Sequence, residues 1–192
     1  MVEPDLFESP GLPEGFLYRE ELLSPEEEAL LVQMFARLPF REFEFQGFLG
    51  KRRIVSFGRR YDFKGGGLQK TEAIPAFLLP VREQAAAFAG LSPESLAHAL
   101  LTEYRPGAAI GWHKDRPVFG DVVGVSLLSA TTFRMRCKTP RGWRRASLKL
   151  QPRSAYLLRG PARMQWEHSI PAADHLRYSI TFRNLTERAT VR

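Results

Sequence analysis

The chain has 192 residues, 44% of them hydrophobic, and a formal net charge of +7. This length and composition are typical of one globular domain with a sizeable core, and no run of about 18 apolar residues predicts a membrane span. Because Cys137 is the only cysteine, an intrachain disulfide is excluded, and the acidic, Pro-rich N-terminus is unlike a signal or transit peptide, so we expect a cytoplasmic protein.

The first half of the chain predicts two helical regions and one hairpin. Residues 24–27, Ser-Pro-Glu-Glu, are typical of a capped helix N-terminus, and apolar residues then recur at helical spacing as far as Leu38. Residues 43–61 alternate in character and contain turn glycines, which indicates a hairpin. A second helical region is expected over 72–89, interrupted at Pro80 and ended by a glycine.

The second half of the chain predicts β-strands. Short alternating segments separated by turn signals follow one another: "AHALLTEY", "AIGWHKD", "VVGVSLLS", "TFRMRC", "ASLKLQ", "SAYLLRG", "MQWEHSI" and "LRYSITFR". Eight strands after a helical prelude predict a mainly β (α+β) fold, a double-stranded β-helix or jelly roll supported by two N-terminal helices and a hairpin. We expect one domain over 1–192, with a helical and hairpin region at 1–95 and a jelly-roll core at 96–185; the resemblance described below implies that the hairpin is a substrate lid and the core is catalytic.

A His-x-Asp triplet lies at the end of the second of these strands. Side chains at i and i+2 share a face, so His113 and Asp115 can reach one metal ion. With a second imidazole they form the ligand set of a non-haem Fe(II) oxygenase, which leaves coordination positions open. His168 is favoured for that role, because His98 lies on an apolar run and His175 in a polar loop. Taken alone, such a triplet is more often a solvent-facing loop, and a lone histidine more often a core or surface residue.

The last predicted strand carries two arginines. The period of two places Arg177, Ser179, Thr181 and Arg183 on one face. A buried polar row is unfavourable unless each group finds a partner, and guanidinium groups pair with carboxylates bidentately, so a bound dicarboxylate would suit this face. Alternation in the first strand of the series lets Tyr104 face the same cavity. The competing interpretations are a basic sheet face for the arginines and an ordinary core role for the tyrosine.

Residues 101–185 resemble the catalytic core of the AlkB family of Fe(II)/2-oxoglutarate dioxygenases, in the pieces "TEYRPGAAIGWHKD", "VSLLS", "FRMR", "RSAYLLRGPARMQWEHSI" and "LRYSITFR". The resemblance implies that iron is held by His113, Asp115 and His168, and that 2-oxoglutarate is bound by Arg177, Arg183, Tyr104, Thr102 and Ser179. Thr102 and Ser179 stand where family members commonly have asparagine. Pro117 stands where the founding member has a further acidic residue that is used toward the base.

The resemblance also implies an activity. With O2, such an enzyme removes alkyl groups from bases of DNA or RNA and releases succinate, CO2 and an aldehyde, and the base is either single-stranded or flipped out. The alternative is the same oxygenase chemistry on a protein or a small molecule. A binding module with a dead site is disfavoured by the intact charged residues, and a zinc hydrolase leaves the paired arginines unexplained. We expect a monomer with no membrane partner.

Two basic clusters suggest a polyanionic substrate. One stands where the resemblance places the nucleotide-recognition lid and comprises Lys51, Arg52, Arg53, Phe57 and Tyr61. Basic side chains interleaved with aromatic rings suit a polyanion whose bases can stack. The other cluster, within residues 131–153, has eight basic side chains and no acidic one. For it, a nucleic-acid surface and a solvated strand edge protected by charge are equally compatible with the sequence.

Overall fold

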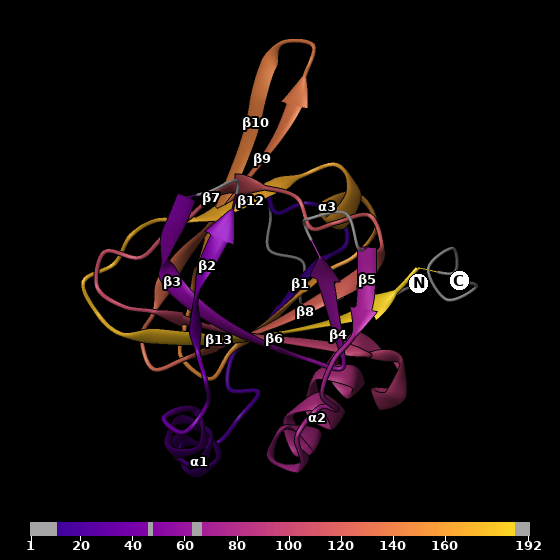
Figure 1. The fold of residues 1–192 in the computed structure, drawn as a ribbon. Helices are drawn as coiled ribbons and strands as arrows, with labels where there is room; N and C mark the ends of the chain where they lie inside the picture. Colours follow the sequence, from indigo (N-terminus) through magenta and orange to yellow (C-terminus); the bar gives the residue numbers. More distant parts are fainter. Residues whose placement is uncertain (1–10, 46–47, 63–66, 187–192) are drawn as a thin grey trace.

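The computed structural model describes residues 11–45, 48–62 and 67–186 (Figure 1). Two short 3-10 helices cover Ala76–Leu78 and Pro93–Ser95. The other elements in chain order are β1 (Phe16–Arg19), α1 (Pro25–Phe35), β2 (Arg41–Phe45), β3 (Phe48–Phe57), β4 (Arg59–Asp62), β5 (Gly67–Lys70), α2 (Leu79–Ala89), β6 (His98–Tyr104), β7 (Ile110–His113), β8 (Phe119–Leu127), β9 (Thr131–Thr139), β10 (Gly142–Leu150), β11 (Ala155–Leu158), α3 (Gly160–Met164), β12 (Glu167–Ile170) and β13 (Arg177–Leu185).

Two antiparallel sheets form the body of the molecule, and the predicted jelly roll is confirmed. The larger sheet has seven strands in the order β1, β11, β8, β13, β6, β3, β2, and the smaller has four in the order β10, β9, β12, β7. Buried side chains from both sheets meet in one apolar cluster, which includes Val122 and Leu158 from the larger sheet and Phe133 and Met135 from the smaller. The inner faces of the two sheets therefore face each other, as expected for packed sheets.

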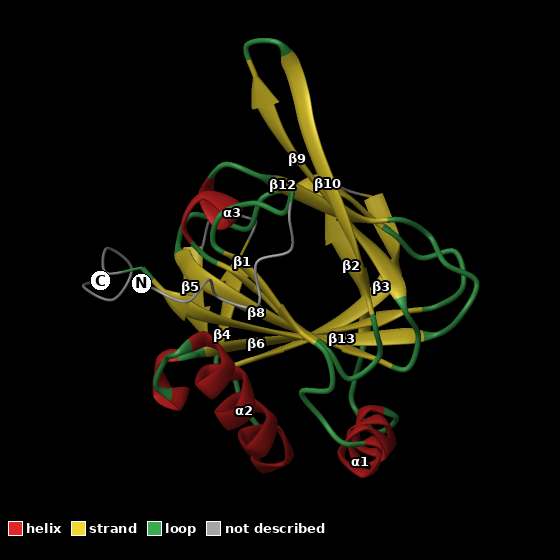
Figure 2. Ribbon diagram, turned by 180° about the vertical axis from the view of Figure 1, so that it is seen from behind, coloured by secondary structure: helices red, strands yellow, loops and turns green. Residues whose placement is uncertain are grey.

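The outer face of the larger sheet packs against the helices (Figure 2). Leu31 and Phe35 of α1 and Val81 of α2 belong to the same buried cluster as Ile180 and Phe182 of β13. The helices thus cover one face of this sheet and leave the other for the space between the sheets. None of the helices in the described ranges is long and apolar enough to cross a membrane.

The helix boundaries depart from the expected ones in two respects. Ser24 and Glu27 make the predicted capping box, with bonds of 3.2 and 2.7 Å, but α1 ends at Phe35, before Leu38. Pro80 lies in the first turn of α2 and so does not interrupt a helix. The first turn tolerates proline because its N–H groups have no partner within the helix.

The N-terminal region contributes more to the sheet than expected. Strands β1, β2 and β3 all precede residue 96, yet they belong to the seven-stranded sheet. The alternating run of residues 43–61 is divided between the β2–β3 pair and β4, which pairs with β5. We did not predict β1, because its sequence, FLYR, shows no apolar–polar alternation.

Candidate active site

The predicted polar row on β13 faces the space between the sheets. The neighbouring strand β6 is in antiparallel register with it, which pairs Arg177 with Tyr104 and Arg183 with His98. The intervening residues Ile180 and Phe182 lie in the helix-side core. Because alternate strand residues point to opposite faces, the two arginines lie on the inner face, as predicted.

Arg177 is buried but incompletely bonded. Its side chain is 2% exposed, its Nε donates to Ser126 Oγ at 3.1 Å, and its Cζ lies 4.7 Å from the centroid of the Tyr104 ring. Both terminal nitrogens, Nη1 and Nη2, are buried without a hydrogen-bond partner among the described residues. A buried cation without a partner is strongly unfavourable, so this guanidinium is arranged to receive an anion.

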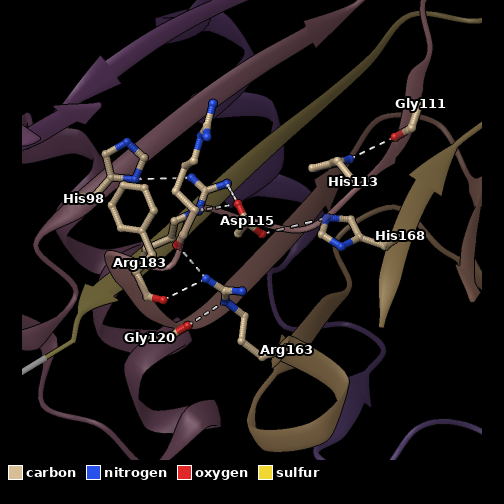
Figure 3. Close-up of polar contacts among 10 residues, drawn as sticks. His98, Gly111, His113, Asp115, Gly120, Arg163, His168 and Arg183 are labelled. Carbon is tan, nitrogen blue, oxygen red and sulfur yellow. Dashed lines mark hydrogen bonds and ion pairs between the residues drawn. The ribbon is translucent and has the colours of Figure 1, made fainter. Parts of the chain in front are cut away.

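The three predicted iron ligands converge beside this row (Figure 3). His113 ends β7 and pairs in register with His168 on β12, and their ring centroids are 4.2 Å apart. Asp115 follows in the next loop, with its Oδ2 3.8 Å from His168 Nε2. His113 Nδ1 lies 2.9 Å from the carbonyl oxygen of Gly111, and a proton there leaves Nε2 as an electron-pair donor.

Arg183 has an arrangement that the sequence did not predict. It donates from Nε and Nη2 to Asp115 Oδ1 at 3.0 and 2.6 Å, and its Nη1 lies 3.2 Å from His98 Nδ1. It therefore faces the Asp115 carboxylate and differs from Arg177 in having its partners within the protein. No three His, Cys, Asp or Glu side chains in the described ranges already have the mutual geometry of a metal site. The predicted ligands are neighbours, but they do not form a completed coordination sphere.

Burial and nearby charges set the protonation of these groups. Burial and the neighbouring His113 lower the pKa of His168 to about 3, and burial also lowers the pKa of His113. Burial alone would raise the pKa of Asp115, but Arg183 and the two imidazoles lower it well below its usual range. Two neutral imidazoles and one ionised carboxylate result, which are the protonation states that bind metal.

The rival histidines lie elsewhere. His98 is buried behind Arg183, with its ring 4.9 Å from that of Phe119, and burial lowers its pKa well below the usual value. It therefore accepts a hydrogen bond from Arg183 as a neutral ring. His175 is exposed in the loop before β13. The preference for His168 agrees with this geometry.

Two supporting residues were not predicted. The buried Arg163 of α3 donates to the carbonyl oxygens of Gly120, Arg116 and Phe119 at 2.7–2.9 Å (Figure 3). These hydrogen bonds hold the loop after Asp115 in position. Tyr156 of β11 lies over Gly124, where an added Cβ would come within 2.2 Å of its ring. A lone arginine in a loop-like segment and a strand tyrosine carry no sequence signal of such roles.

The predicted lid cluster is divided by the structure. Phe57 is 4% exposed and belongs to the helix-side core, so its predicted role in stacking on a base is wrong. Arg53 is also unsuited to gripping phosphate, because it donates to both oxygens of Glu103 at 2.7–2.8 Å. Lys51 is exposed. The charge of Arg52 acts on His113 and interacts with Tyr104, so Arg52 lies near these two residues. The Tyr61 side chain lies outside the described side chains.

The chain matches known proteins over most of its length. A family model for the 2OG-Fe(II) oxygenase superfamily matches residues 15–183. A protein of Danio rerio named Probable RNA/DNA demethylase ALKBH6 is 29% identical over 121 residues, which cover 63% of this chain and 49% of that protein. The tRNA (carboxymethyluridine(34)-5-O)-methyltransferase alkbh8 of Xenopus tropicalis is 26% identical over 166 residues, which cover 84% of this chain and 26% of that protein.

A solved structure has the same fold. The structure of OsALKBH1 matches with a TM-score of 0.71 at 15% identity, covering 90% of this chain and 98% of that one. At this identity the likeness shows the fold alone. The chain spans about half or less of the length of the curated relatives described above.

Proposed function

Because the chain belongs to the 2OG-Fe(II) oxygenase superfamily, we propose that it is an iron(II)- and 2-oxoglutarate-dependent dioxygenase that removes alkyl groups from nucleic-acid bases. The expected resemblance to AlkB proteins is confirmed by the family match and the AlkB-homologue relatives. The observation that carries the proposal is the buried Arg177 guanidinium, which has two unpartnered nitrogens beside a His–Asp–His cluster.

The residues present fit both groups that the family name implies. In the proposal, His113, Asp115 and His168 hold iron(II), since two neutral imidazoles and a carboxylate suit that ion. Arg177 binds one carboxylate of 2-oxoglutarate, and the neighbouring Tyr104, Thr102 and Ser179 supply polar groups on the same inner face. Arg183 holds Asp115 in its ionised form and orients it, which supports metal binding through a ligand's partner.

The reaction divides between the bound groups and the chain. When bound, iron(II) and 2-oxoglutarate would supply hydroxylation chemistry, in which one oxygen atom of O2 enters a substrate C–H bond and the other enters succinate as 2-oxoglutarate loses CO2. The chain orients the cosubstrate through Arg177 and excludes water through the apolar cluster around Phe133 and Met135. On an N-methyl base, the hydroxymethyl product breaks its C–N bond and releases formaldehyde and the unmodified base.

A nucleic-acid substrate is supported by the names of the relatives, by the exposed Lys51 and by Arg52, whose charge acts on His113. The cluster lies between two sheets, so a base must be single-stranded or leave its stack to reach it. The alternative, a protein or small-molecule substrate, is not favoured by these relatives. The monomeric state and the cytoplasmic location remain predictions.

The experiment loads the protein with iron(II) and 2-oxoglutarate without oxygen, and then adds oxygen with methylated single-stranded DNA, methylated single-stranded RNA or unmethylated controls. We expect succinate and formaldehyde to rise together with the methylated strands only. Succinate release that depends on a peptide or metabolite, with none on any oligonucleotide, would replace the proposed substrate class and keep the oxygenase. No 2-oxoglutarate turnover at all would remove the oxygenase proposal.

A further inference from the structure

The hairpin of β9 and β10, here called the finger (residues 131–150), extends beyond the smaller sheet. Strand β12 pairs with β9 only at residues 134–136, so within the described chain no strand lies alongside the outer part of the finger. Figures 1 and 2 both show it projecting from the body on the side opposite α1 and α2. An isolated two-stranded hairpin is only marginally stable in water, so the projecting part of the finger adds little to the stability of the fold. This favours a functional role for the side chains that it carries.

Strand alternation gives the finger two different faces. Phe133 and Met135 point into the apolar cluster between the sheets, on the same side as His168. Arg134, Arg136 and Lys138 therefore point outward. The register of β10 places Trp143 opposite Lys138 and Arg145 opposite Arg136, so both residues share the outer face.

An indole–guanidinium stack crosses this outer face. The Cζ of Arg136 lies 4.4 Å from the ring of Trp112 on β7 and 4.3 Å from that of Trp143 on β10. Arg136 also makes a 2.6 Å ion pair with Glu167. Trp143 remains 40% exposed, which leaves part of its surface open to solvent beyond the contact with Arg136.

The remaining cations of the finger are not neutralised. Lys138, Arg141, Arg145 and Lys149 are exposed and make no salt bridge with any residue that the structure describes. Arg145 stands directly opposite Arg136. Because Arg136 is already paired with Glu167, Arg145 and Lys138 are the outer-face cations beside it that have no carboxylate partner among the described residues.

These contacts decide between the two interpretations of the basic cluster. Protection of an exposed strand edge by charge explains the lysines. It does not explain Trp143, which is partly exposed and stacks on Arg136. Cations combined with a stacking ring are the features of a surface that binds single-stranded nucleic acid, where phosphates need charge and bases need a π-face.

We propose that the outer face of the finger binds the phosphates and bases of single-stranded nucleic acid, with Lys138 and Arg145 contacting phosphates and Trp143 stacking on a base. This inference rests on the proposed function and adds a second substrate contact to it. The stack runs from β10 to β7, the edge strand where Trp112 points outward and the next residue, His113, points to the site. A nucleic-acid strand that follows the stack therefore reaches the edge of the smaller sheet next to the candidate metal ligands.

The test measures binding of unmethylated oligo-dT and oligo-U to the full chain over a range of salt concentrations, without iron, 2-oxoglutarate or turnover. The variant Lys138→Gln/Arg145→Gln removes two finger charges without touching the apolar core. Each phosphate contact on a single strand contributes about 0.7 to the slope of log K against log salt, so we expect the slope to fall by about 1.4. The matched control, Arg19→Gln/Arg37→Gln, removes two exposed charges elsewhere and should leave the slope unchanged.

Stacking has its own readout. We expect oligonucleotide to quench tryptophan fluorescence in the wild type and much less in Trp143→Phe, which keeps a ring for stacking and therefore keeps binding. A finger variant that binds like the control variant, or quenching that is unaffected by Trp143→Phe, would overturn the proposal. Comparison of oligo-dT with oligo-U identifies the preferred nucleic acid.

Failure of this inference is distinguishable from failure of the proposed function. If the finger double variant binds oligonucleotide with an unchanged slope while the wild type still dealkylates methylated strands, only the finger assignment is lost. If the finger binds as expected but no methylated strand is turned over, the binding surface stands and the dealkylation proposal is lost.

Discussion

Arg177 is the residue on which the account of cosubstrate binding depends. Its two terminal nitrogens are buried without a hydrogen-bond partner in the described part of the chain, whereas those of Arg183 contact Asp115 and His98. An anion that binds Arg177 therefore gains a full ion pair, whereas one approaching Arg183 meets a guanidinium that already has partners. The two arginines that appear equivalent in the sequence have different surroundings in the structure.

Replacing Arg177 should weaken the binding of 2-oxoglutarate without lowering the stability of the unliganded protein. For Arg177→Met we expect the dissociation constant for 2-oxoglutarate to rise by roughly one and a half to four orders of magnitude, the equivalent of about 2–5 kcal/mol for a lost buried charge partner. Without 2-oxoglutarate, the variant should be no less stable than the wild type, because an unpaired buried charge is removed. Calorimetry and urea unfolding measure the two quantities, and an unchanged dissociation constant would refute the assignment.

The proposed iron ligands should behave as a set. We expect His113→Ala, Asp115→Ala and His168→Ala each to lower bound iron(II) below one equivalent and to abolish 2-oxoglutarate turnover while the protein stays folded. His175→Ala is the matched control, since that histidine is exposed in a loop. Full iron content and activity in one of the three variants would remove that residue from the ligand set.

For individual residues, the sequence predicted which side chains lie close together but not which of them form ion pairs. Strand alternation predicted that Tyr104 faces the same side as Arg177, and the resemblance to AlkB proteins implied that His168 joins His113. In the structure both pairs are in register on neighbouring strands. The Arg183–Asp115 ion pair could not be predicted, since 68 residues separate its members and it depends on the loop after β7. Phe57 was misassigned because an aromatic ring in a basic segment gives no indication of which face it occupies.

At the scale of elements, Glu103 links β6 to its neighbours. It is 5% exposed and accepts hydrogen bonds from Arg53 of β3, Arg105 and the hydroxyl of Tyr178 on β13. Burial would raise the pKa of Glu103, but the hydrogen bonds from Arg53 and Arg105 outweigh it and lower the pKa. An ionised carboxylate thus links β3 to β6 within the larger sheet.

Glu103→Gln should therefore lower the free energy of unfolding at neutral pH by about 1–3 kcal/mol, the range for a buried charged hydrogen-bond partner. A carboxyl with a lowered pKa stabilises the fold above its unfolded pKa, and that contribution disappears as the pH falls through the folded pKa. The difference between wild type and variant should accordingly shrink as the pH falls below about 4.3. Urea unfolding at several pH values tests this, with the exposed Glu94→Gln as control; a difference that does not vary with pH would contradict it.

Strand β8 makes room for Tyr156 through Gly124. A Cβ at this position would approach the Tyr156 ring to within 2.2–2.3 Å, so Gly124→Ala should displace the ring and destabilise the protein by roughly 1–3 kcal/mol. In Gly124→Ala/Tyr156→Leu the clash is relieved, and we expect the two effects to be non-additive. Thermal unfolding of the wild type, the two single variants and the double variant measures the coupling between the two substitutions. Additive changes in stability would show that the ring and the glycine are independent.

For the whole molecule, the sequence indicated the class of fold well and the assembly of the sheets less well. All eight alternating segments after residue 96 contain the expected strands, because each segment is bounded by turn signals. The short β1 and the joining of β2 and β3 to the catalytic sheet were not expected, since sheet order depends on long-range pairing that a local pattern does not encode. The projection of the finger likewise follows from where β12 ends and not from its own residues.

The larger sheet separates structural and chemical roles. Its outer face is apolar and packs on α1 and α2. Its inner face carries Arg177 and Arg183 of β13 and Tyr104 of β6. The smaller sheet has a parallel division, with His113 and His168 inside and the basic stack of the finger outside. In the two proposals, the cosubstrate and the reacting base lie between the sheets, whereas the outer face of the finger binds other parts of the same nucleic-acid strand.

The proposed function is the oxidative dealkylation of nucleic-acid bases by this chain with iron(II) and 2-oxoglutarate. Its most direct measurement is mass spectrometry of a methylated single-stranded oligonucleotide after incubation with the loaded protein and O2, alongside quantified formaldehyde and succinate. We predict loss of the methyl group, with formaldehyde formed in equal amount, in the wild type and in neither His168→Ala nor Arg177→Met. An oligonucleotide of unchanged mass, while 2-oxoglutarate is consumed with another substrate, would contradict the claim.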